Sequence, residues 1–135
     1  MMKHLLKIII FLTVVTSLSF CSKNEVLVSR NTTCEEDQIT IENKLKEIIK
    51  LSESIPCKDA SSWKFVSYGA KACGGPVGYI AYSTELDVEA FISKVNNLSL
   101  LQDAVNKKCK LVSDCTVPIE PKGIISENNK PVFYY

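Results

Sequence analysis

Apolar residues recur at helical spacing in two stretches of the chain, and each stretch follows a helix-capping sequence. In the first, Thr33-Cys34-Glu35-Glu36 matches a capping box, and the apolar stripe behind it predicts a helix over residues 35–53. In the second, Thr84-Glu85-Leu86-Asp87 matches the same pattern, and the stripe predicts a helix that extends to about Lys108. The stripes consist of Ile41, Leu45, Ile48 and Ile49 in the first helix and of Val88, Phe91, Ile92, Val95, Leu98, Leu101 and Val105 in the second.

Between the two helices, apolar and polar residues alternate with the period of a strand. The alternation around Trp63 and Phe65 predicts a strand near residues 62–69, and Val77–Tyr82 forms a second run of this kind. Glycine and proline residues separate the two runs. They are therefore expected to form a hairpin with a wide loop.

The C-terminal third of the chain predicts further strands. Cys115–Glu120 has the pattern of a strand, which Pro118 and Pro121 would confine to a sheet edge. Residues 124–135 resemble a second hairpin, with a turn at 127–130. The expected fold class is therefore α+β, with a small antiparallel sheet of about four strands, two helices packed on one face, and stabilising disulfides.

The first twenty residues have the features of an export signal. Lys3 and Lys7 precede and flank an apolar run at residues 8–15. The apolar stretch from Leu5 to Phe20 is short and is interrupted by Lys, Thr and Ser, which disfavours a membrane span. Residues 1–20 are therefore interpreted as a signal peptide.

Two cleavage sites fit this signal. Leu18-Ser19-Phe20-Cys21 resembles the lipobox of bacterial lipoproteins, in which Cys21 is lipidated and becomes the first residue of the mature chain. Cleavage after Ser19 would instead release a soluble chain. We favour lipidation, followed by a flexible tether over residues 21–33 and a single α+β domain over 34–135. The expected location is the cell envelope, as an outer-membrane lipoprotein on its periplasmic or surface side, with secretion as the alternative.

Charge and composition narrow the function classes. The 135-residue chain has a formal net charge of +1, which becomes −1 once Lys3 and Lys7 leave with the signal peptide, so no nucleic-acid partner is expected. The only histidine, His4, leaves as well, which excludes histidine-based nucleophilic catalysis in the mature protein. No glycine-rich phosphate loop is present. We therefore predict a protein that is not an enzyme and that needs no cofactor and no metal.

The cysteines predict a disulfide framework in an exported chain. Spacing alone does not determine how they pair. Our favoured pairs join Cys73 to Cys115, each in a short motif flanked by turns, and Cys34 to Cys57, at the two ends of the first helical segment. The chain holds six cysteines, namely Cys21, Cys34, Cys57, Cys73, Cys109 and Cys115.

This pairing leaves Cys109 as a free thiol, or as a partner of Cys21 in the secreted form. Neighbouring lysines at 107, 108 and 110 would lower the pKa of such a thiol. The sequence offers it no base and no orienting partner, so catalysis by Cys109 is a minor hypothesis. The cysteine spacings also differ from those of zinc sites.

Two short motifs carry a resemblance to a known group of proteins. Ala72-Cys73-Gly74-Gly75-Pro76 and Ser113-Asp114-Cys115, with the prolines that follow, resemble a group of small exported lipoproteins of the Bacteroidetes type. The resemblance covers residues 57–135. It implies an exported domain that contains a disulfide, and it implies no catalytic residue and no particular ligand.

The leading functional hypothesis is a lipid-anchored binding or interaction module whose partner is a protein or another envelope component. Aromatic residues near the strands are expected to lie mainly in the core, with Tyr134 and Tyr135 the most exposed. The alternative is a secreted inhibitor of proteases or lysozyme that acts through a preorganised loop. The candidate binding residues of that loop are Lys71, Ala72, Gly74, Gly75 and Pro76.

Overall fold

The computed structural model describes residues 28, 29 and 31–135. The predicted signal peptide at residues 1–20, the predicted lipidation site Cys21 and most of the predicted tether lie outside these residues. Within the described part, the elements follow the order α2, a 3-10 turn, β1, β2, α3, β3 and β4. Neither of the two described α-helices is long and apolar enough to cross a membrane.

Helix α2 spans Cys34–Ser52, close to the predicted range. The Thr33 hydroxyl accepts a hydrogen bond from the Glu36 N–H, and the Glu36 carboxylate accepts one from the Thr33 N–H, so the predicted capping box is present. These two bonds satisfy backbone donors that no helical carbonyl can reach. The acidic residues of the first turn also suit the positive end of the helix dipole.

Helix α3 spans Val88–Cys109 without a break at the asparagine pair at 96–97. Its N-cap is Asp87, whose carboxylate accepts a hydrogen bond from the Ala90 N–H. The predicted capping box at Thr84–Asp87 is therefore wrong by one turn. The Thr84 side chain donates instead to the carbonyl of Ser62, just before the first strand.

The strands form two antiparallel hairpins. Strand β1 (Trp63–Tyr68) pairs with β2 (Gly78–Ser83), and β3 (Gly123–Glu127) pairs with β4 (Lys130–Tyr134). The wide loop between β1 and β2 was predicted. The second hairpin closes through two asparagines at 128 and 129 that both have positive φ, as a tight primed turn requires.

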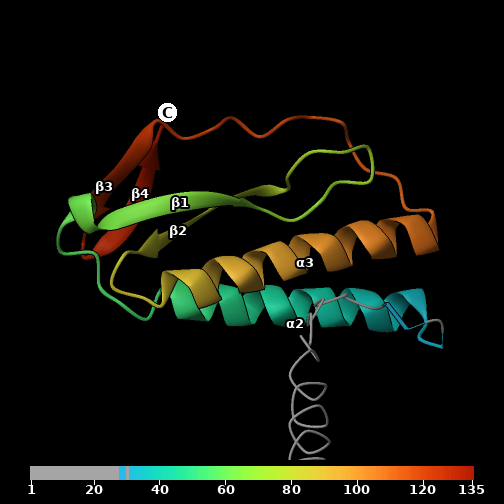
Figure 1. Ribbon diagram of the computed structural model, residues 1–135. Helices are drawn as coiled ribbons and strands as arrows, with labels where there is room; N and C mark the ends of the chain where they lie inside the picture. The colour runs from blue at the N-terminus through green and yellow to red at the C-terminus, as the bar shows by residue number, and fades with distance from the viewer. Residues whose placement is uncertain (1–27, 30) are drawn as a thin grey trace, which may run out of the picture.

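The first hairpin lies between the two helices and the second hairpin, so both of its faces are covered (Figure 1). Side chains such as Ile80 and Tyr82 point to the helices and join Phe91, Val95 and Leu98 in the larger core. Successive residues of a strand point to opposite faces. A second, smaller core therefore forms on the other face, where Trp63, Ala81 and Cys57 meet Ile124 and Phe133.

The α+β class and the two helices are as predicted, but the sheet arrangement is not a single sheet of about four strands. The described residues contain two separate two-stranded sheets. Residues 115–120, predicted as an edge strand, form no strand and pair with no other segment. Proline at 118 and 121 removes two backbone donors, and Ile119 is 75% exposed, so this segment lacks both the hydrogen bonds and the burial that a strand needs.

Candidate functional site

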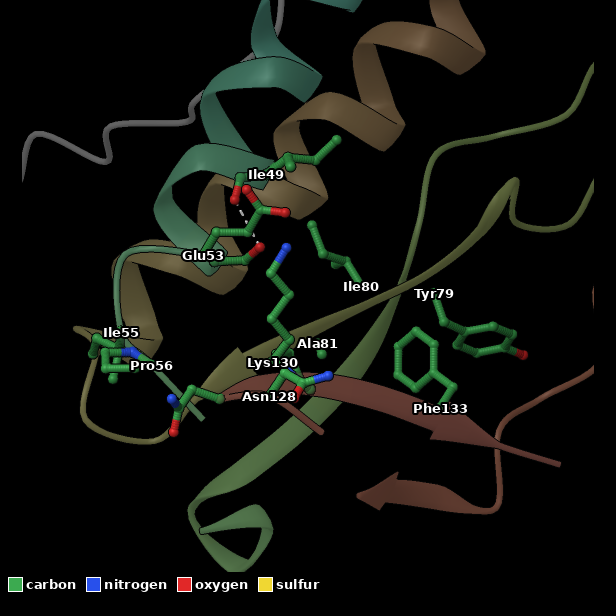
Figure 2. Close-up of a pocket in the computed structure, with 13 residues that line it drawn as sticks. Ile49, Glu53, Ile55, Pro56, Tyr79, Ile80, Ala81, Asn128, Lys130 and Phe133 are labelled. Atoms are coloured by element: carbon green, nitrogen blue, oxygen red, sulfur yellow. Dashed lines mark hydrogen bonds between the residues drawn. The ribbon is translucent and has the colours of Figure 1, made fainter. Parts of the chain in front are cut away.

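A groove with a volume of about 510 Å³ lies between the C-terminal end of α2, strand β2 and the tip of the β3–β4 hairpin (Figure 2). Ligand sites in proteins commonly measure roughly 300–1,000 Å³. The groove is open to solvent rather than enclosed. It is therefore large enough for several side chains of a partner, and it remains accessible from outside.

The floor of the groove is the free edge of strand β2. Three consecutive residues, Tyr79, Ile80 and Ala81, line the groove, although their side chains alternate between the two faces of the hairpin. A cavity that touches three consecutive strand residues must reach the backbone between them. Strand β2 pairs only with β1 among the described strands, so its other edge faces the groove.

The strand register identifies which backbone groups this edge presents. The Thr84 N–H donates to the Ser62 carbonyl, and this pair continues the register of β1 and β2. Because hydrogen-bonded positions alternate along an antiparallel strand, every second residue that precedes Thr84 in β2 bonds to β1. Tyr79 and Ala81 lie between these positions, and their N–H and C=O groups point away from β1. No other backbone group of a described residue bonds to them. The groove floor thus offers two donors and two acceptors in strand geometry.

The walls of the groove are mainly apolar. Ile49 on α2 contributes one wall and is 38% exposed. The rings of Tyr79 and Phe133 contribute another, and each packs edge-to-face against Phe65 at a centroid distance of 5.9 Å. These contacts fix the orientation of both rings. The aromatic wall is therefore preformed.

The rim of the groove carries opposite charges. Figure 2 shows the Lys130 side chain reaching from β4 toward Glu53, which caps the end of α2. Asn128 and Asn129 of the hairpin turn complete the polar rim. The Asn129 carbonyl accepts a hydrogen bond from the Cys57 N–H at 2.8 Å, so the turn is held against the chain that follows α2.

The loop predicted as an inhibitory element lies away from this groove, between β1 and β2. At its base, the Asn106 side chain donates to the Ala70 carbonyl at 2.8 Å, which anchors the loop to α3. The Lys71 ammonium group donates to the Asp114 carboxylate at 2.9 Å and to the Thr116 carbonyl at 2.6 Å. At its tip, Gly74 and Gly75 have open space around them. The loop is thus fixed at its base and exposed at its tip.

The structure corrects the predicted pairing of Cys34. This residue forms a disulfide with Cys109, across a Cα–Cα distance of 5.9 Å, and not with Cys57. The predicted free thiol at Cys109 is wrong for the same reason. Cys57 lies fully buried in the smaller core, remote from the start of α2. The two helices run antiparallel, which brings the first residue of α2 next to the last residue of α3 (Figure 1).

A cluster of polar contacts surrounds this disulfide. The Lys108 ammonium group donates to the Asp37 carboxylate at 2.6 Å and to the Thr32 carbonyl at 2.7 Å. Hydrogen bonds from Lys108 and Thr32 hold the pKa of the Asp37 carboxyl below its usual range. All partners of this cation are provided by the chain itself, so we interpret the cluster as a structural contact between the helix ends.

The other predicted pair, Cys73 and Cys115, consists of two exposed thiols that both contact Ser113. The Cys73 sulfur contacts the Asp114 carbonyl at 3.3 Å and the Ser113 hydroxyl at 3.4 Å. The Cys115 sulfur contacts the Ser113 carbonyl at 4.0 Å. The structure therefore brings the predicted partners together as thiols, without a bond between them.

Metal-binding chemistry finds no support among residues 28, 29 and 31–135, where no group of three or more His, Cys, Asp or Glu side chains converges. The acidic run at residues 35–37 lies in the first turn of α2, and Glu89 lies in the first turn of α3. The predictions that the protein is not an enzyme and needs no cofactor stay predictions.

Comparisons with protein-family models, with curated sequences and with solved structures each give no significant match for this chain.

The groove could not be found in the sequence, although some of its residues were named there. Tyr79 and Phe133 belong to the aromatic group considered above, and the structure separates them from Trp63 and Tyr82, which are buried. Ile49 was assigned to the apolar stripe of the first helix.

Proposed function

We propose that this protein is an exported, lipid-anchored module of the cell envelope that binds an extended polypeptide segment of a partner protein. The observation that carries the binding role is the groove whose floor is the unpaired edge of β2. The proposed export and anchoring of the protein rest on the sequence of residues 1–21, which contain an apolar run typical of a signal peptide and the lipobox-like Leu18-Ser19-Phe20-Cys21.

An extended peptide matches this groove better than a compact small molecule. Peptides add to a free strand edge through main-chain hydrogen bonds, and pockets beside the edge select their side chains. Tyr79 and Ala81 offer the main-chain groups, and the apolar walls offer the pockets. A small molecule is usually enclosed over most of its surface, whereas this groove is open to solvent.

The rim adds a preference for the partner's polar groups. Glu53 and Lys130 place a negative and a positive charge at the rim of the groove. A bound strand with alternating residues would direct its apolar side chains to Ile49 and Phe133 and its polar ones to this rim. We therefore expect alternating apolar and polar residues in the ligand.

Binding can be tested with fluorescent peptides of about six residues, the usual strand length, in which Val or Ile alternates with Thr, Lys or Glu. Fluorescence polarisation would measure affinity, and amide NMR shifts would report whether Tyr79 and Ala81 are involved. A peptide of the same composition with N-methylated backbone at alternate positions is the control, because it cannot complete the ladder. Equal binding of both peptides would contradict strand addition.

A matched pair of variants on helix α2 tests the apolar wall. Ile49 lines the groove, whereas Ile39 is 51% exposed on the same helix and lies outside it. Ile49→Lys should weaken peptide binding about tenfold or more, because burying an Ile side chain contributes about 1.5–3 kcal/mol. Ile39→Lys should leave the affinity unchanged. Equal effects of the two changes would argue against the groove as the site.

Anchoring has its own test, independent of the ligand. Cys21→Ser should release the protein from the membrane fraction into the soluble fraction of cells while the purified variant keeps its helical circular dichroism. Continued membrane association of Cys21→Ser, or a native chain that starts at Phe20, would contradict the lipoprotein proposal. The second outcome would favour secretion.

The exposed loop supports inhibition of proteases or lysozyme as a second candidate function. Its base is fixed by Lys71 and Asn106 and its tip is open, which limits the entropy lost on insertion into an enzyme cleft. Inhibition assays with hen-type lysozyme and with serine proteases would test it. Ala72→Asp, at an exposed position of the loop, should abolish any inhibition, and Ile39→Lys serves as the unaffected control.

A further inference from the structure

The two exposed thiols lie where two loops from distant parts of the sequence meet. The loop at residues 70–76 is docked on the extended segment at 113–116 through the Lys71–Asp114 ion pair. Next to this ion pair, both cysteines contact Ser113. The Cys73 sulfur contacts the Ser113 hydroxyl, and the Cys115 sulfur contacts the Ser113 carbonyl. The docking therefore holds the thiols together independently of any bond between them.

The surroundings of the two sulfurs differ in a way that distinguishes their reactivity. Hydrogen bonds from the Cys115 thiol and the Ser113 hydroxyl, with a smaller contribution from the Lys71 charge, lower the pKa of the Cys73 thiol. The hydrogen bond between the two cysteines raises the pKa of the Cys115 thiol, because Cys115 donates its proton to the Cys73 sulfur. Cys57, by contrast, is fully buried and out of reach of any reagent while the protein is folded.

We propose that Cys73 and Cys115 form a solvent-accessible thiol–disulfide exchange site, in which Cys73 reacts with the external partner and Cys115 closes the bond. The partner is a small-molecule or protein disulfide. This site lies in the β1–β2 loop and the segment after α3, and it does not involve the peptide groove.

The exchange proceeds in two balanced steps. The Cys73 thiolate attacks one sulfur of the external disulfide, which forms a mixed disulfide and expels one thiolate that takes up the proton lost by Cys73. Cys115 then loses its proton and attacks the Cys73 sulfur, which closes the Cys73–Cys115 bond and expels the second thiol. Two electrons pass from the cysteine pair to the external disulfide, and the reverse reaction opens the bond.

The experiment uses the full chain with Cys21→Ser, so that the lipidation site contributes no thiol. The protein is equilibrated with mixtures of reduced and oxidised glutathione, quenched with N-ethylmaleimide and analysed by peptide mass spectrometry. We expect the Cys73–Cys115 bond to form and open reversibly across the series, while Cys34–Cys109 stays intact and Cys57 stays unmodified. Circular dichroism at each point verifies that the protein remains folded.

Two single variants test the assigned order. Cys115→Ser should accumulate a glutathione adduct on Cys73, because no second thiol resolves it. In Cys73→Ser, Cys115 should react with oxidised glutathione more slowly than Cys73 does in Cys115→Ser, because the Ser113 hydroxyl stabilises the Cys73 thiolate whereas the Asp114 charge disfavours a thiolate at Cys115. Both positions are exposed, so the variants should keep the fold.

Three results would overturn the proposal. The first is a Cys73–Cys115 bond that opens only under conditions that unfold the protein, which would make it a permanent structural disulfide. The second is independent modification of the two thiols by glutathione with no intramolecular bond. The third is faster reaction of Cys115 than of Cys73 in the single variants, which would contradict the assigned order.

Discussion

Loss of the Cys34–Cys109 disulfide is predicted to remove a large part of the stability of this protein. The bond joins residues with a sequence separation of 75, so it closes a long loop in the unfolded chain. The chain-entropy relation gives a stabilisation of about 4.5 kcal/mol for a loop of that size at 25 °C. Domains of this size have total stabilities of about 5–15 kcal/mol. The bond would then account for a third or more of the total.

Urea unfolding followed by tryptophan fluorescence measures this contribution directly. The chain has a single tryptophan, Trp63, which is 6% exposed and packs in the smaller core, so its emission reports on the folded state. Breaking the bond should lower the urea midpoint by about 1.5 M or more, given a slope of about 1–3 kcal/mol per M. Cys34 is exposed, so its replacement by Ser removes little apolar burial and isolates the effect of the bond.

The variants provide internal checks. Cys34→Ser, Cys109→Ser and the double variant should unfold at the same midpoint, because each breaks the same bond. Native protein in reductant should unfold at the same midpoint as the double variant in reductant. Cys73→Ser is the matched control at an exposed cysteine outside this disulfide. A loss below about 1 kcal/mol in the double variant would refute the chain-entropy argument, and unequal single variants would indicate a role beyond the bond.

Two further predictions concern stability and pH. Asp37→Asn should be less stable than the native protein at pH 7, because the hydrogen bond from Lys108 lowers the pKa of the Asp37 carboxyl in the folded state. This stabilisation is lost as the pH falls below about 4, so thermal unfolding should show a smaller difference between the two proteins at pH 2.5 than at pH 7. A difference that stays constant with pH would contradict this prediction. Phe91→Ala should lower the free energy of unfolding in urea by about 3–5 kcal/mol, because Phe91 is fully buried. Leu100→Ala on the same helix should change it by less than about 0.5 kcal/mol, because Leu100 is 56% exposed. Similar losses in both variants would contradict the assigned core.

Local sequence patterns predicted the elements well where one face of an element is buried. The helix-capping residue Thr33 and the stripe behind it define α2 almost to the residue. The alternation near Trp63 and the asparagine turn between β3 and β4 likewise identify both hairpins. The segment at 115–120 was predicted wrongly, because an extended pattern alone does not supply a pairing partner.

Long-range arrangement was harder to predict, because it depends on how the elements pack. The alternation around Trp63 indicates two different faces, but it does not indicate that a second hairpin covers one of them. The Cys34–Cys109 pair had a usable signal, since the two cysteines lie at the start and the end of two helices of similar length. Antiparallel packing of such helices brings these ends together. The groove had no such signal, because its parts come from α2, β2 and β4.

The disulfide also divides the molecule into a covalent ring and a tail. Every residue of the larger core lies between Cys34 and Cys109 and therefore inside the ring. The smaller core is completed by Ile124 and Phe133, which lie outside it. Unfolding of the tail leaves the ring closed and its larger core intact, so the β3–β4 hairpin can detach alone. Since this hairpin forms one wall of the groove, its local opening would remove the proposed peptide site while the rest of the fold persists.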